Sequence, residues 1–347
     1  MMSDLSPNRV IEQAMARAPR ILRFDREAYL PEWQSAARRT LKQLLGVMPQ
    51  AVDLNVEIVR RERHAGLGCE EIELTFVAER DCVAHATLLL PAGASAAKPV
   101  PAMICLQGHS TGAHISLGRK KFAKDEELLK GDRDFAVQAV KRGYAALALE
   151  QRGFGTRSDT RGAEVRHANF NGCHHLTMTS LLVGRTMLGQ RVWDVLRAID
   201  VLTGHFAEVD ASRINLMGQS GGGTVSYYAA AYDQRISAVM PSCSVCTFAA
   251  SIGAIDHCAD NYVPNIMHYF EMSDIAGLIA PRPLVVVAGE TDDIFPVEAV
   301  KRNFDEIAEI YEAFGAAEKC GLVIGNGGHQ FYADAGWLMF ERMTTPR

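Results

Sequence analysis

The sequence lacks both a long apolar run and an excess of positive charge. Its 347 residues carry 36 Lys and Arg against 41 Asp and Glu, a formal net charge of −5, which argues against a protein that coats nucleic acid or an anionic membrane. No apolar run approaches the roughly 20 residues that a transmembrane helix needs. The first 20 residues also lack the apolar core of a secretory signal. We therefore expect a cytoplasmic protein with no nucleic-acid and no membrane partner.

Cysteine spacing gives no sign of a metal or disulfide framework. The eight cysteines are scattered, mostly within apolar stretches, where a reduced cysteine behaves as a small apolar side chain. One close pair, Cys243 and Cys246, lacks the second pair that a zinc site usually has. The chain also has no Walker loop and no complete Gly-X-Gly-X-X-Gly fingerprint. We expect no metal and no cofactor.

What the sequence does contain is ample apolar material, at 48%, in alternating strand-like and helix-like runs. Such alternation predicts an α/β fold, with a mostly parallel central sheet and helices on both faces. Three opening runs alternate in the manner of antiparallel strands, at 52–61, 70–78 and 83–91. Later apolar runs predict buried parallel strands at 101–106, 144–150, 213–217, 236–241, 283–289 and 319–325. Intervening runs predict helices at 134–144, 175–204, 222–233 and 297–314.

The chain divides into an arm and one main domain. Residues 1–50 form a helical arm, with a second helix opened by Pro31, and residues 51–347 form the main α/β domain. The arm either packs on that domain or makes an oligomer contact. Residues 243–280 interrupt the alternation, as a cap or insertion near the carboxyl edge of the sheet would. Its large apolar side chains either fill a satellite core or, in the case of Tyr262 and Phe270, wall a pocket.

The strongest chemical signal is Gly-Gln-Ser-Gly-Gly, centred on Ser220. It lies between a predicted strand and a predicted helix, which is the setting of a nucleophile elbow. Small residues two before and two after the serine are needed there, because a Cβ would collide in so tight a turn. We interpret Ser220 as a catalytic nucleophile.

A serine hydroxyl needs a base, and on this kind of sheet the acid and then the base follow the serine along the chain. His329 lies in a Gly-rich loop after the last predicted strand, so it is the expected base. Asp292 and Asp293 both follow the strand before it. Asp292 is favoured as the acid because it lies three residues after Gly289, whereas Asp293 could cap the next turn or helix.

An oxyanion hole should supply two backbone N–H groups. One is that of Gly221, directly after the nucleophile. The other is expected in the loop 107–110, most simply at His109. The alternative is that Gly108 only turns the chain there.

Several segments together resemble a known superfamily. LQGH, YAALALEQRGFG, GQSGGG, APRPLVVVAGETDDIFP and GGH, spread over residues 100–332, resemble the dienelactone hydrolase-like and acetyl xylan esterase-like branch of the α/β-hydrolases. The resemblance implies an α/β-hydrolase fold and a serine hydrolase that cleaves a small carboxylic ester through an acyl-enzyme on Ser220. Dienelactone hydrolases carry a cysteine where this chain has Ser220. The sugar deacetylases usually have Gln at the position of Gly221, and their RGQG reads RGFG at 152–155, which puts sugar deacetylation in doubt.

Other readings of function stay open. The same three residues would serve a peptidase or a carbon–carbon or thioester hydrolase, and relatives without activity serve as binding modules. The substrate pocket is expected from the segments 109–118, 152–175 and 243–273. Arginines that could either meet an acidic substrate or form structural ion pairs are Arg152, Arg157 and Arg185.

Overall fold

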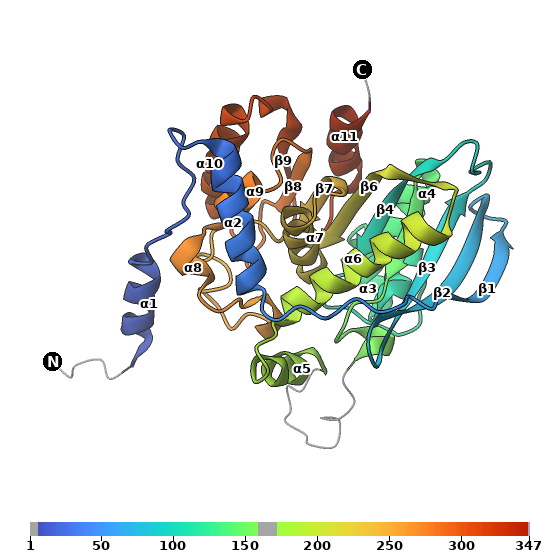
Figure 1. Cartoon of the computed structure of the whole chain (residues 1–347), viewed down its shortest axis with the longest axis horizontal. Coiled ribbons are helices and arrows are strands. Elements are labelled where there is room, and N and C mark those ends of the chain that lie inside the picture. Colours follow the sequence, from blue (N-terminus) through green and yellow to red (C-terminus); the bar gives the residue numbers. More distant parts are fainter. Residues whose placement is uncertain (1–5, 159–171, 346–347) are drawn as a thin grey trace.

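A nine-stranded sheet forms the centre of the molecule in the computed structural model, which describes residues 6–158 and 172–345. The strand order is β1-β2-β3-β5-β4-β6-β7-β8-β9. The first three strands pair antiparallel, and those from β5 onward pair parallel to one another. The predicted α/β fold is therefore confirmed (Figure 1). The strands are β1 (Glu57–His64), β2 (Cys69–Glu79), β3 (Cys82–Pro91), β4 (Val100–Leu106), β5 (Ala145–Leu149), β6 (Val209–Gln219), β7 (Ile236–Ser242), β8 (Leu284–Gly289) and β9 (Cys320–Gly325).

Helices cover both faces of this sheet, because successive side chains of a strand point to opposite faces. In β4, Ile104 belongs to a core shared with α6, α7 and α10, whereas Met103 and Cys105 belong to a core shared with α4 and α11. The helices are α1 (Asn8–Ala16), α2 (Leu30–Leu44), α3 (Asp125–Lys130), α4 (Phe135–Lys141), α5 (Gly172–Leu181), α6 (Met187–His205), α7 (Gly221–Tyr232), α8 (Ile266–Tyr269), α9 (Met272–Gly277), α10 (Val297–Ala313) and α11 (Ala333–Thr344).

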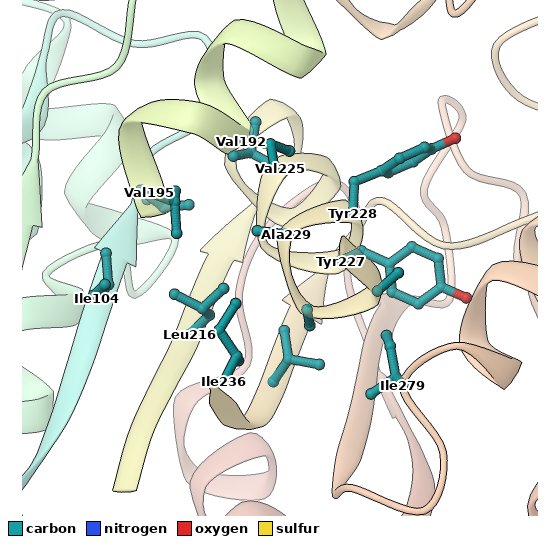
Figure 2. Close-up of a cluster of buried hydrophobic side chains, with 14 of the residues drawn as sticks. Ile104, Val192, Val195, Leu216, Val225, Tyr227, Tyr228, Ala229, Ile236 and Ile279 are labelled. Atoms are coloured by element: carbon teal, nitrogen blue, oxygen red, sulfur yellow. The ribbon is translucent and has the colours of Figure 1, made fainter. Parts of the chain in front are cut away.

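The helix α7 is held against the sheet by a dense apolar core (Figure 2). Val192 of α6 lies beside Val225 of α7, and Leu216 of β6 faces them from the sheet. All three side chains are almost fully buried, and burying a side chain of this size contributes about 1.5–3 kcal/mol. This packing fixes the N-terminus of α7, where the candidate nucleophile lies.

The N-terminal arm has two helices of different character. In α2, Trp33, Ala37 and Leu41 lie four residues apart on one face and are buried, and a proline in the first turn opens the helix as predicted. In α1, by contrast, no residue is buried, and the helix lies at the end of the molecule far from β1 (Figure 1). Whether α1 contacts a second copy stays a prediction.

The single helix predicted over 175–204 is wrong. Two helices occupy this stretch, since α5 ends at Leu181 and α6 begins at Met187. Gly184 between them has a φ of +72°, a backbone conformation that ends a helix. The Thr186 hydroxyl then accepts a hydrogen bond from the Gly189 amide (2.9 Å) and caps α6.

The two edges of the sheet differ, and β1 forms the more polar one. Its sequence is EIVRRERH, and its side chains are exposed or half-buried throughout. Within residues 6–158 and 172–345, no helix is both long and apolar enough to cross a membrane.

Candidate active site

Ser220 lies at the turn between β6 and α7, with φ +57° and ψ −127°. A non-glycine residue adopts such a conformation only when the surroundings force it, at a cost of about 1–3 kcal/mol. A Cβ at Gly218 would collide with the Gly222 backbone, and a Cβ at Gly222 would collide with Leu106. The steric reason for the small residues on either side of the serine is therefore confirmed.

His329 and Asp292 meet at the same edge of the sheet. The Nδ1 atom of His329 lies 2.9 Å from Oδ2 of Asp292. The other carboxylate oxygen, Oδ1, accepts hydrogen bonds from the amides of Ile294 (2.9 Å) and Phe295 (3.2 Å). Asp293 is exposed to solvent. The structure thus brings Asp292, and not its neighbour, to the imidazole.

The environment of Asp292 keeps it ionised. Burial alone would raise the pKa of this carboxyl, but the hydrogen bond and charge of His329 and the two backbone donors outweigh burial and hold the pKa below its usual value. The His329 ring is stacked on that of Phe295, with centroids 5.9 Å apart. The imidazole is therefore held by a carboxylate at its edge and by an aromatic ring on its face.

The loop that carries His329 lies against the elbow. The Gln219 side-chain amide donates a hydrogen bond to the His329 carbonyl oxygen (3.3 Å), which ties the residue before Ser220 to this loop. Among the described residues, the Ser220 hydroxyl makes no hydrogen bond to the His329 ring. Catalytic hydrogen bonds are often absent or long before substrate binds.

The loop after β4 approaches the nucleophile closely. A Cβ at Gly108 would lie 2.8 Å from Cβ of Ser220 and 2.7 Å from the Gln219 carbonyl oxygen, so only glycine fits there. A Cβ at Gly221 would lie 3.5 Å from Nδ1 of His109. The structure therefore brings Gly221 and His109 together beside Ser220. The Ser220 amide itself donates to the Ser242 carbonyl oxygen (2.8 Å) and is not free for a ligand.

Sequence reasoning missed two residues of this region, Arg191 in α6 and Asp260 in the insertion. Their side chains form an ion pair, and Asp260 also lies next to His109. Neither residue belongs to a motif, and they are 69 positions apart, so no spacing in the sequence could have paired them.

Among the residues that the structure describes, two trios of side chains come close enough to share a metal ion. They are Cys243, Asp292 and His329, and His109, Cys258 and Asp260. In the first trio, Asp292 and His329 are hydrogen-bonded to each other. Burial raises the pKa of the Cys243 thiol, which therefore stays protonated. In the second trio the carboxylate already contacts a guanidinium, and that cation would repel a metal ion. Both trios fit hydrogen-bonded networks better than metal centres.

The sequence also predicted that Phe270, Tyr262 and the segment 152–175 line the substrate pocket. Phe270 is only 1% exposed and belongs to the core, so the prediction that it walls a substrate pocket is wrong and the packing interpretation holds. Tyr262 donates to the Ile252 carbonyl oxygen (2.9 Å) and lines an apolar pocket of about 480 Å³ between α1 and the insertion. Residues 159–171 of the expected pocket segment 152–175 lie outside the described residues.

The three arginines considered for an acidic substrate form structural ion pairs. Arg152 contacts both Asp194 and Glu79. Arg157 also pairs with Asp194, over 2.7 Å. Arg185 also pairs with Glu79, over 2.9 Å. These contacts occupy the guanidinium groups of Arg152, Arg157 and Arg185.

Comparison with known proteins assigns the chain to a family. The model of the Abhydrolase family matches residues 2–320. The chain belongs to this family. A relative of this abhydrolase is YtaP of Bacillus subtilis strain 168, which is named provisionally as a hydrolase. It is 28% identical over 295 residues, which cover 84% of this chain and 92% of YtaP.

Solved structures share the fold of this abhydrolase at low sequence identity. A protein of Bacteroides fragilis NCTC 9343, described provisionally as an acetyl xylan esterase, superposes with a TM-score of 0.76 at 19% identity, covering 99% of this chain and 90% of the other. A glucuronoyl esterase from Solibacter usitatus has a TM-score of 0.67 at 17% identity, covering 90% and 92%. An acetyl xylan esterase from Paenibacillus sp. R4 has a TM-score of 0.58 at 18% identity, covering 95% and 98%. At these identities the likeness establishes the α/β-hydrolase fold alone.

Proposed function

We propose that this abhydrolase is a serine hydrolase that cleaves a small carboxylic ester through an acyl-enzyme on Ser220. The observation that carries the proposal is the hydrogen bond of His329 to a buried carboxylate, Asp292, at the sheet edge where the strained elbow presents Ser220. A strained serine beside an oriented imidazole is the arrangement that nucleophilic acyl transfer requires.

In the proposed reaction, the Ser220 hydroxyl oxygen attacks the ester carbonyl carbon while His329 takes its proton. Asp292 holds the imidazole in the tautomer that carries hydrogen on Nδ1, and it stabilises the imidazolium without taking the proton. His329 then gives the proton to the departing alkoxide, leaving an acyl-serine. A water molecule then attacks the acyl carbonyl carbon while His329 takes its proton. His329 returns that proton to the Ser220 oxygen as the acyl–oxygen bond breaks, and the carboxylic acid is released.

The negative charge that develops on the carbonyl oxygen needs donors held in place beforehand. We assign this role to the backbone N–H groups of Gly221 and His109, because the contact of Gly108 with Ser220 brings the two loops together. The Ser220 amide is already bonded to Ser242, so it does not compete for the role.

The names of the structural neighbours favour ester hydrolysis among the reactions open to this fold, since they are acetyl xylan and glucuronoyl esterases. A peptidase or a carbon–carbon or thioester hydrolase would use the same residues, and the substrate panel below separates these classes. We further propose that the enzyme works without a cofactor, because each step above is assigned to a side chain or amide of the chain. A location in the cytoplasm stays a prediction.

The decisive experiment is the Ser220→Ala variant. We expect it to fold normally and to lose p-nitrophenyl acetate hydrolysis by on the order of 10⁶-fold in kcat, the scale seen when a triad nucleophile is removed. A fluorophosphonate probe should label the wild type and not this variant. Ser226→Ala is the matched control, because that hydroxyl donates to the Gly222 carbonyl oxygen within α7 (2.8 Å) and lies in no proposed role.

Labelling that persists in Ser220→Ala would show that another residue is the nucleophile. A second experiment compares the activity of the wild type on p-nitrophenyl esters, acetylated sugars, thioesters and peptide p-nitroanilides. Higher kcat/KM on the anilides or thioesters than on every oxygen ester would replace the esterase assignment with the corresponding alternative.

A further inference from the structure

A second histidine–aspartate pair lies beside Ser220, and its side chains have no part in the proposed hydrolysis. The Nε2 atom of His109 is buried and lies 3.3 Å from Oδ2 of Asp260, although the two atoms are not aligned for a hydrogen bond. The His109 side chain is 28% exposed, whereas that of Asp260 is 0% exposed. One end of the imidazole thus faces a buried carboxylate, and the ring itself reaches the surface of the site.

A buried scaffold fixes Asp260 in this place. The Arg191 guanidinium donates to Oδ2 of Asp260, and both side chains are at most 1% exposed. Oδ1 accepts a hydrogen bond from the Asn261 side chain (3.2 Å), and Nε of Arg191 donates to the Arg152 carbonyl oxygen (2.9 Å). A buried ion pair seldom adds much net stability compared with apolar residues of similar size. Its evident effect here is to hold one carboxylate oxygen beside His109.

An aromatic ring fixes the plane of the imidazole. Phe154 packs edge-on against the His109 ring, with centroids 4.7 Å apart. The guanidinium of Arg191 lies over the Phe154 ring, 4.1 Å from its centroid. His109 is therefore held by groups from α6, from the insertion and from the segment after β5.

The protonation state of His109 follows from these neighbours. Burial lowers the pKa of the imidazole, the carboxylate of Asp260 opposes this effect, and the charges of Arg191 and His257 lower the pKa further. A neutral imidazole carries one proton, and the carboxylate beside Nε2 favours its placement there. Nδ1 is then left as a hydrogen-bond acceptor.

The position of Nδ1 indicates what it would accept. Unlike Nε2, it is not buried, and within residues 6–158 and 172–345 no group donates to it. It lies 3.5 Å from the place of a Cβ on Gly221, whose amide is the proposed donor to the carbonyl oxygen of the substrate. An acceptor that faces the substrate beside Gly221 would repel any substrate oxygen placed against it. The contact becomes favourable when the substrate places a hydrogen-bond donor, rather than an oxygen lone pair, against Nδ1.

We propose that the His109 side chain is a specificity-determining residue that accepts a hydrogen bond at Nδ1 from a hydroxyl group next to the scissile ester. Asp260 and Arg191 are positioning residues for it. This inference rests on the proposed function and narrows the substrate to hydroxylated esters. A carboxylate at the same place would meet an acceptor and be rejected.

The test uses substrate pairs that differ only in the hydrogen-bond donor. One pair has the hydroxyl on the acyl part, methyl 2-hydroxypropanoate against methyl 2-methoxypropanoate. The other has it on the alcohol part, 2-hydroxyethyl acetate against 2-methoxyethyl acetate. A methyl ether keeps the oxygen and removes its hydrogen. We expect the wild type to favour the hydroxyl ester of one pair by about tenfold or more in kcat/KM, and which pair responds identifies the side of the ester that carries the hydroxyl.

Three variants separate the acceptor from the rest of the ring. His109→Leu removes both nitrogens, His109→Gln keeps a polar group near Nε2, and His109→Asn keeps one near Nδ1. The backbone N–H of residue 109 is unchanged in all three. We expect the hydroxyl-to-methoxy ratio of kcat/KM to fall to about one in the Leu and Gln variants. The Asn variant should retain part of the preference.

Each result decides the question. A wild type that cleaves p-nitrophenyl acetate without preferring either hydroxyl ester overturns the inference and leaves the proposed function intact. A preference for the hydroxyl ester that persists in both the His109→Leu and His109→Gln variants also overturns the inference and leaves the proposed function intact. If the Leu variant does not fold, the Gln variant carries the comparison alone. Absence of fluorophosphonate labelling in the wild type would instead overturn the proposed function itself.

Discussion

At the scale of single residues, burial distinguishes two neighbouring aspartates that are chemically identical. Asp292 is enclosed and accepts from two amides and an imidazole, whereas Asp293 is exposed. A carboxylate can orient an imidazole only where its own oxygens are held. The distinction therefore predicts different kinetic effects for the same substitution at adjacent positions.

We expect Asp292→Asn to lower kcat for p-nitrophenyl acetate by on the order of 10⁴-fold, because an amide there favours the wrong tautomer of His329. Asp293→Asn is the matched control and should retain activity within about twofold, because this side chain is exposed and does not contact the imidazole. Steady-state kinetics on the two purified variants, with circular dichroism to confirm folding, decides between them. A greater loss in Asp293→Asn would mean that the acid is one residue further along the chain.

Residues set by local geometry could be predicted from the sequence, and residues joined only by the tertiary fold could not. Ser220 was predictable because the glycines around it are required by the turn. The expected positions of His329 and Asp292 followed from the rule that parallel strands end at one edge. Asp260, by contrast, meets Arg191 and His109 only after the insertion has folded over the loop that follows β4. No periodicity or spacing in the sequence predicts these contacts.

At the scale of elements, short and mainly apolar runs predicted the parallel strands, since a strand covered by helices on both faces is apolar on both of its faces. The long helix over 175–204 was wrong because the apolar periodicity continues across a break set by Gly184. The aromatic residues of the insertion 243–280 suggested a pocket, yet the side chains that the insertion brings to the site include a charged one, Asp260, and a thiol, Cys243.

The buried pair of Asp260 and Arg191 holds the insertion onto α6. We expect Asp260→Asn to lower the free energy of unfolding by about 3–5 kcal/mol, because it leaves the Arg191 guanidinium buried without its counter-charge. Asp256→Asn, an exposed position of the same insertion, should change it by less than about 0.5 kcal/mol. Urea denaturation followed by tryptophan fluorescence measures both. Equal midpoints for the two variants would show that the pair does not hold the insertion in place.

At the scale of the whole molecule, ionisable groups with opposite shifts shape how stability depends on pH. Burial by itself would raise the pKa values of Asp194 and Asp260, but their arginine partners outweigh it and hold them below the ordinary value. Their contribution to stability is present above about pH 4, and it is lost as the pH falls through the lowered values. Acid should therefore lower the free energy of unfolding.

Glu150 behaves in the opposite way. Burial raises the pKa of this carboxyl to about 7, against hydrogen bonds from the amides of Ala113 and Thr156 and the charge of Arg157. Because the folded value lies above the unfolded one, its favourable contribution is complete below about pH 4.5 and is lost as the pH rises through about 7. Relative to Glu150→Gln, the wild type should lose about 3 kcal/mol of stability between pH 4.5 and 8.

Urea midpoints of wild type and Glu150→Gln at closely spaced pH values test this expectation. The difference between the two proteins isolates Glu150, since histidines such as His109 and His257, whose pKa values are lowered by burial, titrate in both. A difference that stays constant from pH 4.5 to 8 would show that folding does not raise the pKa of Glu150.

The charged edge strand β1 affects how two identical molecules can associate through their sheets. Its exposed Arg61, Glu62 and Arg63, with the half-buried Arg60 beside them, leave backbone groups open to pairing but surround them with charge. A strand from a second, identical molecule would have to desolvate these groups and, in a parallel register, place arginine opposite arginine. Edge-to-edge growth into fibrils is therefore disfavoured from this side, even at the high local concentration of newly made chains.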